Sequence, residues 1–408
     1  MDWSALWLVV RRHYRSALLI VVQSALTLAL VANAFWIGVQ RLDRMLKPSG
    51  VPESELVSVR NLWTGADANW RARLEADLAA IRRFPDVVAA YATDSFPLLG
   101  GGSIVDIGVQ PDQKGPTAVA APYSVDEHAL RTLGLNVVAG EWFGPLDIQR
   151  SSDLVGSDAV IVTEEVARSV FPDAVAVGRT IYVGGRPHRI KGVIAPIAIA
   201  FPEGDWNRAF NSNVVLLPRL VEESEAFYVV RTTVGTRDAV LRNLGVQLLQ
   251  RDRDRVLDRE KTFSTIRAEA YAGDRALVVV LAVVATLLLV VTALGIVGTS
   301  NLWVSARRRD IGILRALGAR RRDVIRYFQL ENLLLITCGV SLGVMIGVAA
   351  NAWTVRTAGA EVMDGWFWLG ASAVMIALGQ LGALGPALRA AAVPPVEAIR
   401  SLDLAAGR

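Results

Sequence analysis

The fold of this chain is decided by residues 276–306, which read ALVVVLAVVATLLLVVTALGIVGTSNLWVSA. The stretch contains no Asp, Glu, Lys or Arg, and it exceeds the length of about 20 apolar residues that crosses a bilayer core as a helix. Because it is longer than a straight span needs, we expect the helix to tilt or to project beyond the bilayer. The sequence therefore predicts an integral membrane protein.

Three further stretches lack these charged residues, namely Ser16–Gln40, Asn332–Val355 and Gly365–Leu388. Hydrophobic residues make up 52% of the chain and charged residues 20%, whereas soluble domains carry about 25% charged residues. We therefore predict four transmembrane helices, at residues 16–40, 276–303, 329–355 and 365–388.

The first stretch also has features of a signal peptide. Arg11, Arg12 and Arg15 precede it, and Ala32-Asn33-Ala34 resembles a cleavage site. The apolar run nevertheless continues to Val39, which is too long for the core of an ordinary signal peptide. We expect an uncleaved membrane anchor.

Orientation follows from the arginines of the connecting segments. Eight arginines lie between the second and third spans, namely Arg307, Arg308, Arg309, Arg315, Arg320, Arg321, Arg322 and Arg326. The segment between the third and fourth spans has only Arg356, beside two acidic residues. Since basic short loops stay in the cytoplasm, we expect both termini on the cytoplasmic side and a large domain outside.

These observations give the following predicted order along the chain. A cytoplasmic N-terminus (1–15) and transmembrane helix 1 (16–40) are followed by an extracytoplasmic domain with a stalk (41–275) and helix 2 (276–303). A cytoplasmic loop (304–328), helix 3 (329–355), a short outer loop (356–364), helix 4 (365–388) and a cytoplasmic C-terminus (389–408) complete the chain. The large outer domain is inserted between helices 1 and 2.

The outer domain has a mixed α+β pattern and no cysteine, since the single cysteine, Cys338, lies in the third span. Predicted helices cover 70–84, 126–133, 164–171 and 237–250, and predicted strands cover 87–92, 104–109, 159–162, 180–183, 188–194, 213–217 and 226–234. Thr163 is placed to cap a helix, and residues 184–187 signal a β-hairpin. The charged run 251–261 is expected to be a solvated helix or stalk.

The segment Arg308–Ala319, which reads RRDIGILRALGA, resembles the signature of the FtsX/MacB-type ABC transporter permeases, with Asp310 where that family usually has Glu. Residues 386–391 and 395–400 are similar to the family's C-terminal ending. The outer domain resembles the family's MacB-like periplasmic core through motifs at residues 140–143, 162–165, 171–172, 177–179 and 190–194. The resemblance covers nearly the whole chain.

This resemblance implies a multi-pass protein of the cell inner membrane with a periplasmic domain. It implies a permease subunit that works with a cytoplasmic ABC ATPase subunit, and the ATPase subunit binds the ATP. It also implies a second permease copy or paralogue, which completes a dimer. A periplasmic adaptor and an outer-membrane channel are further partners that the family allows. Export of an amphiphilic substrate is the expected function, and the alternative is an FtsX-like signalling protein that activates an external hydrolase.

The cytoplasmic loop carries the candidate site. Ile311, Leu314 and Leu317 fall on one face of a short helix, and Gly318 is suited to end it. The resemblance implies that this is the coupling helix, which contacts the ATPase, with Asp310 and Arg315 at its rim. Charge and amphipathicity alone equally allow a helix that lies on the lipid surface.

Two other patterns concern the spans. Gly339, Gly343 and Gly347 repeat every four residues, which allows close approach of another helix from the same chain or across a dimer. Polar residues within the spans either line a path or, more commonly, bond neighbouring helices. These residues are Gln23, Asn33, Asn301 and Gln380.

The sequence contains no catalytic constellation that we recognise. There is no Gly-x-x-x-x-Gly-Lys-[Ser/Thr] loop for ATP. His13, His128 and His188 are scattered and belong to no metal or nucleophile motif. We therefore expect a non-catalytic membrane subunit without a cofactor or metal of its own.

Overall fold

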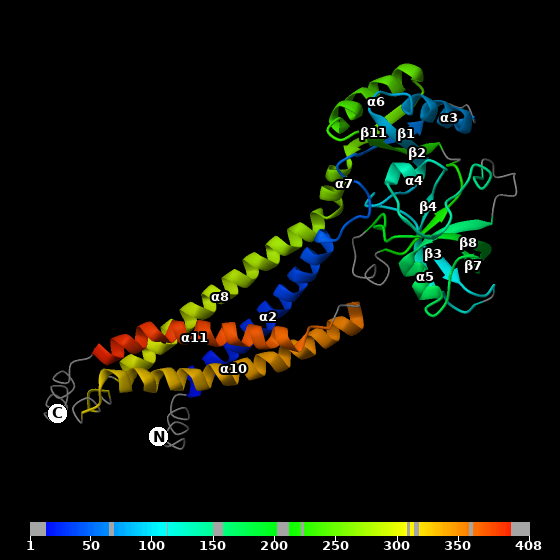
Figure 1. Ribbon diagram of the computed structural model, residues 1–408. Coiled ribbons are helices and arrows are strands. Elements are labelled where there is room, and N and C mark those ends of the chain that lie inside the picture. The colour runs from blue at the N-terminus through cyan, green and yellow to red at the C-terminus, as the bar shows by residue number, and fades with distance from the viewer. Residues whose placement is uncertain are drawn as a thin grey trace. The chain divides into compact units, whose positions relative to one another are not determined.

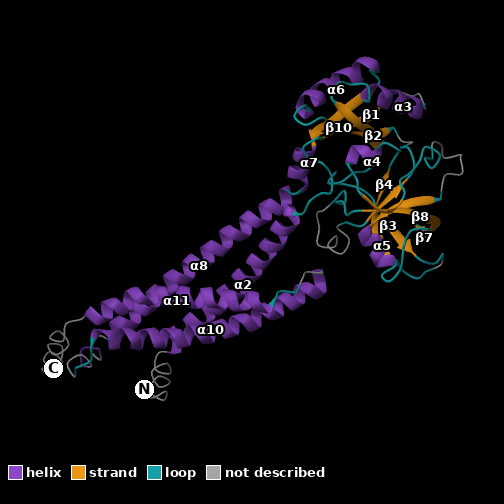
Figure 2. Ribbon diagram, in the orientation of Figure 1, coloured by secondary structure: helices purple, strands orange, loops and turns teal. Residues whose placement is uncertain are grey.

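The computed structural model describes residues 14–64, 69–111, 113–149, 158–201, 212–221, 224–307, 311–313, 318–358 and 362–392 (Figure 1). The chain divides into two compact units. The helical unit comprises residues 1–44 and 275–408, and the α/β unit comprises residues 45–274. Among the described residues, strands occur only in the α/β unit (Figure 2).

The helical unit is built from four long apolar helices: α2 (Tyr14–Leu46), α8 (Ala272–Ala306), α10 (Arg321–Ala358) and α11 (Gly365–Ala392). All four are long and apolar enough to cross a membrane. They share one core, to which each helix contributes. Its buried residues are Ala17, Ile20, Leu28, Ile296, Trp303, Leu335, Ile336, Val340, Met375 and Ala383.

The helices extend beyond the predicted spans. α8 continues to Ala306, and α10 already begins at Arg321. The segment between these two helices is therefore residues 307–320, shorter than the predicted loop 304–328. The reason is local, because the Asp323 carboxylate accepts a hydrogen bond from the backbone N–H of Arg320 at 2.9 Å and so caps the start of α10.

One sheet of the α/β unit has four antiparallel strands in the order β11-β1-β10-β2. The strands are β1 (Leu56–Trp63), β2 (Val87–Thr93), β10 (Glu225–Thr232) and β11 (Arg255–Thr262). Helices α3 (Trp70–Ile81) and α6 (Arg237–Arg251) cover one face, where Val59 packs with Leu74 and Leu244. The other face, with Leu56 and Phe227, shares a core with the second sheet.

The second sheet has seven strands in the order β5-β8-β6-β9-β4-β3-β7. Its strands are β3 (Val105–Gly108), β4 (Ala118–Ser124), β5 (Val137–Gly140), β6 (Ala159–Thr163), β7 (Thr180–Val183), β8 (Arg186–Ile194) and β9 (Val214–Leu217). It closes on itself because β7 pairs with both β3 and β8. Three short helices accompany the sheets: α4 (Ala129–Leu133), α5 (Glu164–Val170) and α7 (Phe263–Ala270).

The charged run 251–261 is not the predicted solvated helix or stalk. Its first residue ends α6, and residues 255–261 belong to β11, which pairs with β1 at the edge of the four-stranded sheet. The Arg255 side chain anchors the strand, since it is 1% exposed and donates to both oxygens of Asp77 on α3 at 2.7 and 3.2 Å. Charged side chains are common on edge strands, where they discourage pairing with other chains.

Two predicted local features also differ. The hairpin turn is only Gly184-Gly185, because Val183 already pairs with Arg186. Both glycines have positive φ, 57° and 80°, as a type I′ turn requires. Thr163 precedes α5 without capping it. Its hydroxyl instead donates to the carbonyl of Ser212 at 2.6 Å.

Strands β1, β4 and β5 were absent from the predicted set. In β1 the first four residues are all buried, because helices cover one face and the second sheet covers the other. A strand that is buried on both faces lacks the alternation that identifies a strand in sequence.

Candidate functional site

The predicted ATPase-coupling residues lie in residues 307–320, which we term the coupling segment. Asp310, Leu314, Arg315 and Leu317 lie outside the described residues, so their role stays a prediction. Gly318 adopts a φ of 98°. This left-handed conformation is the one that favours glycine at a helix end.

Ile311 points into the chain itself. It is 4% exposed and joins a buried cluster at the ends of three helices, made of Val304, Val324, Phe328, Ala387, Ala390 and Ala391. Its neighbour Ile313 is 43% exposed, because residues two apart in a helix do not share a face. Ile311 therefore packs against the chain's own helices, and its predicted contact with the ATPase stays a prediction.

A buried ion pair fastens the start of the coupling segment. Arg307 donates from Nη1 to both carboxylate oxygens of Glu331 on α10, at 3.1 and 2.9 Å, and its guanidinium carbon lies 5.5 Å from the centroid of the Trp303 ring. Glu331 is 1% exposed. Removing one partner of such a pair leaves an uncompensated buried charge. Sequence reasoning missed this pair, although Glu331 directly precedes the charge-free stretch that begins at Asn332.

The three spaced glycines of α10 pack within the chain. A Cβ added at Gly343 would lie 2.7 Å from the carbonyl oxygen of Ala25, and one at Gly339 would meet Ser24, both on α2. At Gly347 a Cβ would meet the ring of Trp368 on α11. These glycines contact helices of the same chain, and a dimer contact on this helix stays a prediction.

Polar side chains in the spans bond neighbouring helices. Gln23 donates to the carbonyl of Val291 on α8 at 3.1 Å, and Asn33 donates to that of Gly347 on α10 at 3.4 Å. Two further hydroxyls, those of Thr27 and Thr292, lie 2.6 Å apart between α2 and α8. These contacts satisfy groups that would otherwise be costly in a bilayer.

The helical unit contains an apolar pocket of about 550 Å³. Its walls come from α2, α8 and α11, with Phe35, Leu289, Phe367 and Met375 among them. The α8 helix beside this pocket is largely uncovered by its own chain. Only 6% of its most apolar 18-residue window is buried, against 39% for α2.

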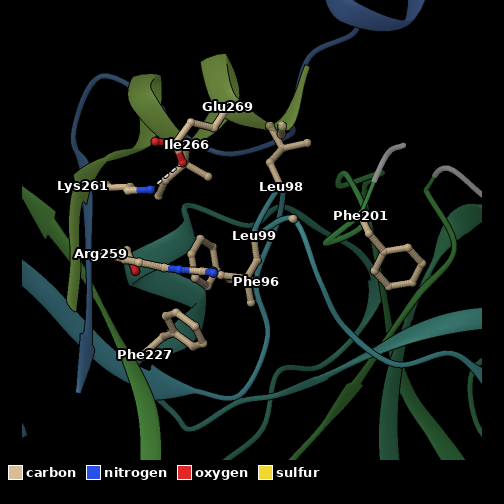
Figure 3. Close-up of a pocket in the computed structure, with 12 residues that line it drawn as sticks. Phe96, Leu98, Leu99, Phe201, Phe227, Arg259, Lys261, Ile266 and Glu269 are labelled. Atoms are coloured by element: carbon tan, nitrogen blue, oxygen red, sulfur yellow. Dashed lines mark hydrogen bonds and ion pairs between the residues drawn. The ribbon is translucent and has the colours of Figure 1, made fainter. Parts of the chain in front are cut away.

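A second pocket, which we term the β11 pocket, lies within the α/β unit and has a volume of about 300 Å³ (Figure 3). Its walls come from β1, β10, β11, α7 and the loop segments around Phe96 and Phe201. Figure 3 shows that Arg259 extends toward Phe96 and Leu99, and that Lys261 lies beside Glu269. The pocket lining combines apolar side chains with charged groups of both signs, and more of the exposed lining is polar than apolar.

The two histidines of the described part lie on different elements, His128 just before α4 and His188 on β8. His128 lies 3.9 Å from Glu127, and burial lowers the pKa of His188. No group of three or more His, Cys, Asp or Glu residues in the described part of the chain could hold a metal ion. His13 lies outside the described residues.

Comparison with known proteins identifies two segments of the chain. Residues 29–250 match the family described as MacB-like periplasmic core domain, and residues 282–395 match the family described as FtsX-like permease C-terminal. The first match alone covers more than half of the chain. The chain belongs to the MacB-type permease family. The family assignment from sequence is confirmed, as is the presence of apolar helices together with a MacB-like domain.

Relatives of this MacB-type chain include two proteins named macrolide export ATP-binding/permease protein MacB. The one from Shewanella sp. (strain W3-18-1) is 26% identical over 279 residues, which is 66% of this chain and 41% of the relative. The one from Shewanella oneidensis is 25% identical over 343 residues, 81% of this chain and 49% of the relative. The chain therefore spans about half the length of these relatives or less.

Among solved structures, the periplasmic region of MacB from Actinobacillus actinomycetemcomitans is similar at 14% identity with a TM-score of 0.34. The match covers 54% of this chain and 96% of that structure. So loose a superposition supports no comparison of individual elements.

Proposed function

We propose that this chain is the permease subunit of an ABC transporter. In this role it couples ATP hydrolysis by a separate ATPase subunit to movement of the α/β unit, and it exports an amphiphilic substrate. The observation that carries the proposal is the presence on one chain of both family segments, the MacB-like core and the FtsX-like C-terminal region, together with four apolar helices.

The relatives support the need for an ATPase. Their names combine ATP-binding and permease functions, and this chain matches less than half of their length. Its own sequence has no phosphate-binding loop of the Walker type. A separate subunit is therefore proposed to supply the ATPase.

The topology that follows places the α/β unit in the periplasm, inserted between the first and second spans. The coupling segment and both termini lie in the cytoplasm, because arginines concentrate on that side. In this arrangement the coupling segment is on the side of the membrane where ATP is available.

The coupling segment has a fixed base and an outward face. Ile311 and the Arg307–Glu331 ion pair hold it against α10. Leu314 and Leu317 are proposed to bind a groove of the ATPase together with Ile313, which is exposed, while Asp310 and Arg315 orient the segment. Since the base is attached to two spans, movement of the ATPase is transmitted to α8 and α10.

A second permease copy or paralogue is proposed to pack on α8. This helix presents a row of exposed apolar residues, including Val279, Val283, Leu287 and Leu294, which its own chain leaves largely uncovered. Without a hydrophobic driving force in lipid, such association depends on close packing between helices.

The test is co-purification of the ATPase with two paired variants. Leu314→Ala with Leu317→Ala should weaken assembly or uncouple ATP hydrolysis from export, because truncating interface anchors costs about 2 kcal/mol or more. Arg321→Gln with Arg322→Gln, on the exposed start of α10, is the matched control and should bind the ATPase normally. If the leucine pair assembles and functions like the wild type while the arginine pair does not, the segment is a lipid anchor.

Export is distinguished from signalling by whether a substrate crosses the membrane. In proteoliposomes that contain the chain and its ATPase, the proposal predicts ATP-dependent movement of an amphiphile across the bilayer. ATP turnover that responds to coupling-segment variants, without movement of any substrate, would favour the FtsX-like signalling alternative.

A further inference from the structure

We propose that the β11 pocket binds a linear amphiphile, with the apolar chain inside the pocket and an anionic head group held by Arg259. The inference deepens the proposed function by giving its ligand a chemical class, and it rests on that function only for the ligand's role as cargo. The binding itself is a property of the α/β unit.

Part of the pocket lining is apolar and can hold a short stretch of hydrocarbon, while polar atoms make up the larger share of the exposed lining. Phe96 and Phe227 form its base, with ring centroids 5.6 Å apart and ring planes at 68°. Leu98 and Ile266 also line the pocket. All four residues are buried, so each presents only a small part of its surface to the pocket. A cavity that combines apolar side chains with convergent polar groups suits a ligand that has both kinds of surface.

The size of the pocket restricts the ligand. About 300 Å³ lies at the lower end of the range of roughly 300 to 1,000 Å³ that ligand pockets span. The pocket can therefore enclose one chain or one small ring system, and it is too small for the whole of a large macrocycle. This favours a linear amphiphile over a bulky one.

A β-bulge brings an extra cation to the pocket. Ser58 pairs with Lys261 and Arg60 pairs with Asp258, so β11 has one residue more than β1 over this interval. Arg259 lies in the bulge and has a φ of 49°, in the left-handed region. Bulges next to binding sites redirect side chains, and left-handed backbone at a non-glycine residue is concentrated at functional sites.

The neighbouring cations are already neutralised, whereas Arg259 is not. Arg60 donates to both carboxylate oxygens of Glu225, at 2.7 and 2.8 Å. Lys261 donates to Glu269. The Arg259 guanidinium makes no hydrogen bond or ion pair with any residue that the structure describes, although its charge reaches Glu225.

The exposed guanidinium of Arg259, beside a cavity of mixed polarity, selects the charge of the ligand. It forms charge-assisted hydrogen bonds with a carboxylate, sulfate or phosphate and repels a cationic head group. The ligand also touches α7, whose residues Ile266 and Ala270 line the pocket. Because α8 begins at Ala272, occupancy of the pocket acts on the segment that leads directly into the second span.

The experiment is photocrosslinking to the full chain in nanodiscs, without ATPase or nucleotide. The probe is a medium-chain fatty acid with a diazirine near the end of its chain, and the control probe is the corresponding alcohol. Crosslinked peptides are identified by mass spectrometry. Crosslinks to the four apolar helices, which probe dissolved in the bilayer also reaches, serve as an internal reference.

The acid should label peptides that contain Leu98, Leu99 and Phe227, and the alcohol should label them much less. Arg259→Gln should reduce this labelling about tenfold, as expected for loss of a hydrogen bond to a charged group, without changing the reference. Leu99→Trp, which fills the cavity, should also reduce it. Arg242→Gln, at an exposed position of α6 on the opposite face of the sheet, is the matched control and should have no effect.

Equal labelling by acid and alcohol, or labelling confined to the apolar helices, would overturn the proposal. The comparison of acid with alcohol and the location of the crosslinks are both measured on the native chain. They therefore test binding in the β11 pocket even if a variant fails to fold. Competition by an anionic phospholipid in the nanodisc would identify the membrane as the source of the ligand, and its absence would identify a soluble amphiphile. Because ATPase is absent, failure here leaves the coupling test on Leu314 and Leu317 unaffected.

Discussion

The helical unit and the α/β unit stabilise their buried polar groups in different ways. Most polar side chains within the spans bond a backbone carbonyl of the same or a neighbouring helix, as Gln23 and Asn33 do. The α/β unit instead buries a network in which Asp77 accepts from Arg255 and from the Tyr228 hydroxyl, the latter at 2.7 Å. Single bonds to the backbone can be lost one at a time, whereas the network depends on all its members.

The largest effect is expected where a buried ion pair is broken, as at Asp77 in the α/β unit and equally at the Arg307–Glu331 pair of the helical unit. Asp77→Ala leaves Arg255 buried without its carboxylate, and breaking a buried pair in this way costs about 3 to 5 kcal/mol. We expect the thermal unfolding transition of the α/β unit to move to markedly lower temperature, as measured by intrinsic fluorescence.

The control is Asp254→Ala. The Asp254 side chain is exposed and directly precedes Arg255, the first residue of β11. Surface substitutions of this kind change stability by about 0.5 kcal/mol or less. Equal effects of the two substitutions would show that the network is not what stabilises this sheet.

A smaller effect is expected where helices of the helical unit approach most closely. Gly343→Leu places a side chain against the backbone of α2, only 2.7 Å from the Ala25 carbonyl oxygen. Overpacking of this kind costs about 1 to 3 kcal/mol, so the detergent-solubilised chain should lose its monodisperse elution at a lower temperature. Gly298→Leu on α8, where an added Cβ meets nothing within 4 Å, should behave like the wild type.

The smallest effect is expected for a single polar contact between spans. Thr27→Val removes the hydroxyl that lies 2.6 Å from that of Thr292. Contacts of this type between membrane helices are worth about 0.6 kcal/mol. A double-mutant cycle with Thr292→Val measures the interaction free energy of the two hydroxyls. A value of about 3 kcal/mol or more, as expected for the Asp77 ion pair, would show that single contacts between spans are as strong as the buried network.

The same contrast explains which parts of the structure could be predicted. The four long helices follow from charge-free stretches, because the bilayer imposes one simple requirement on every residue of a span. The strand β11 could not be recognised, because its charged residues look solvated until the partner of Arg255 is known. That partner, Asp77, is 178 residues away in the sequence.

The candidate site shows the same division. The spacing of Gly339 and Gly343 indicated close helix packing, but only the structure shows that α2 of the same chain is the neighbour. Periodicity placed Ile311 on an apolar face without showing whether the chain itself covers that face. The β11 pocket could not be predicted, since a bulge and segments from distant parts of the chain together create it.

The most direct test of the account is the side of the membrane on which each region lies. Single cysteines are introduced as Leu146→Cys, at a fully exposed position of the α/β unit, and as Ala319→Cys in the coupling segment, both with Cys338→Ala. Cells with a permeabilised outer membrane are treated with a membrane-impermeant maleimide. The proposed topology predicts labelling of Leu146→Cys in these cells and of Ala319→Cys only after lysis. Labelling of Ala319→Cys but not Leu146→Cys before lysis would contradict the proposed topology and, with it, coupling to a cytoplasmic ATPase.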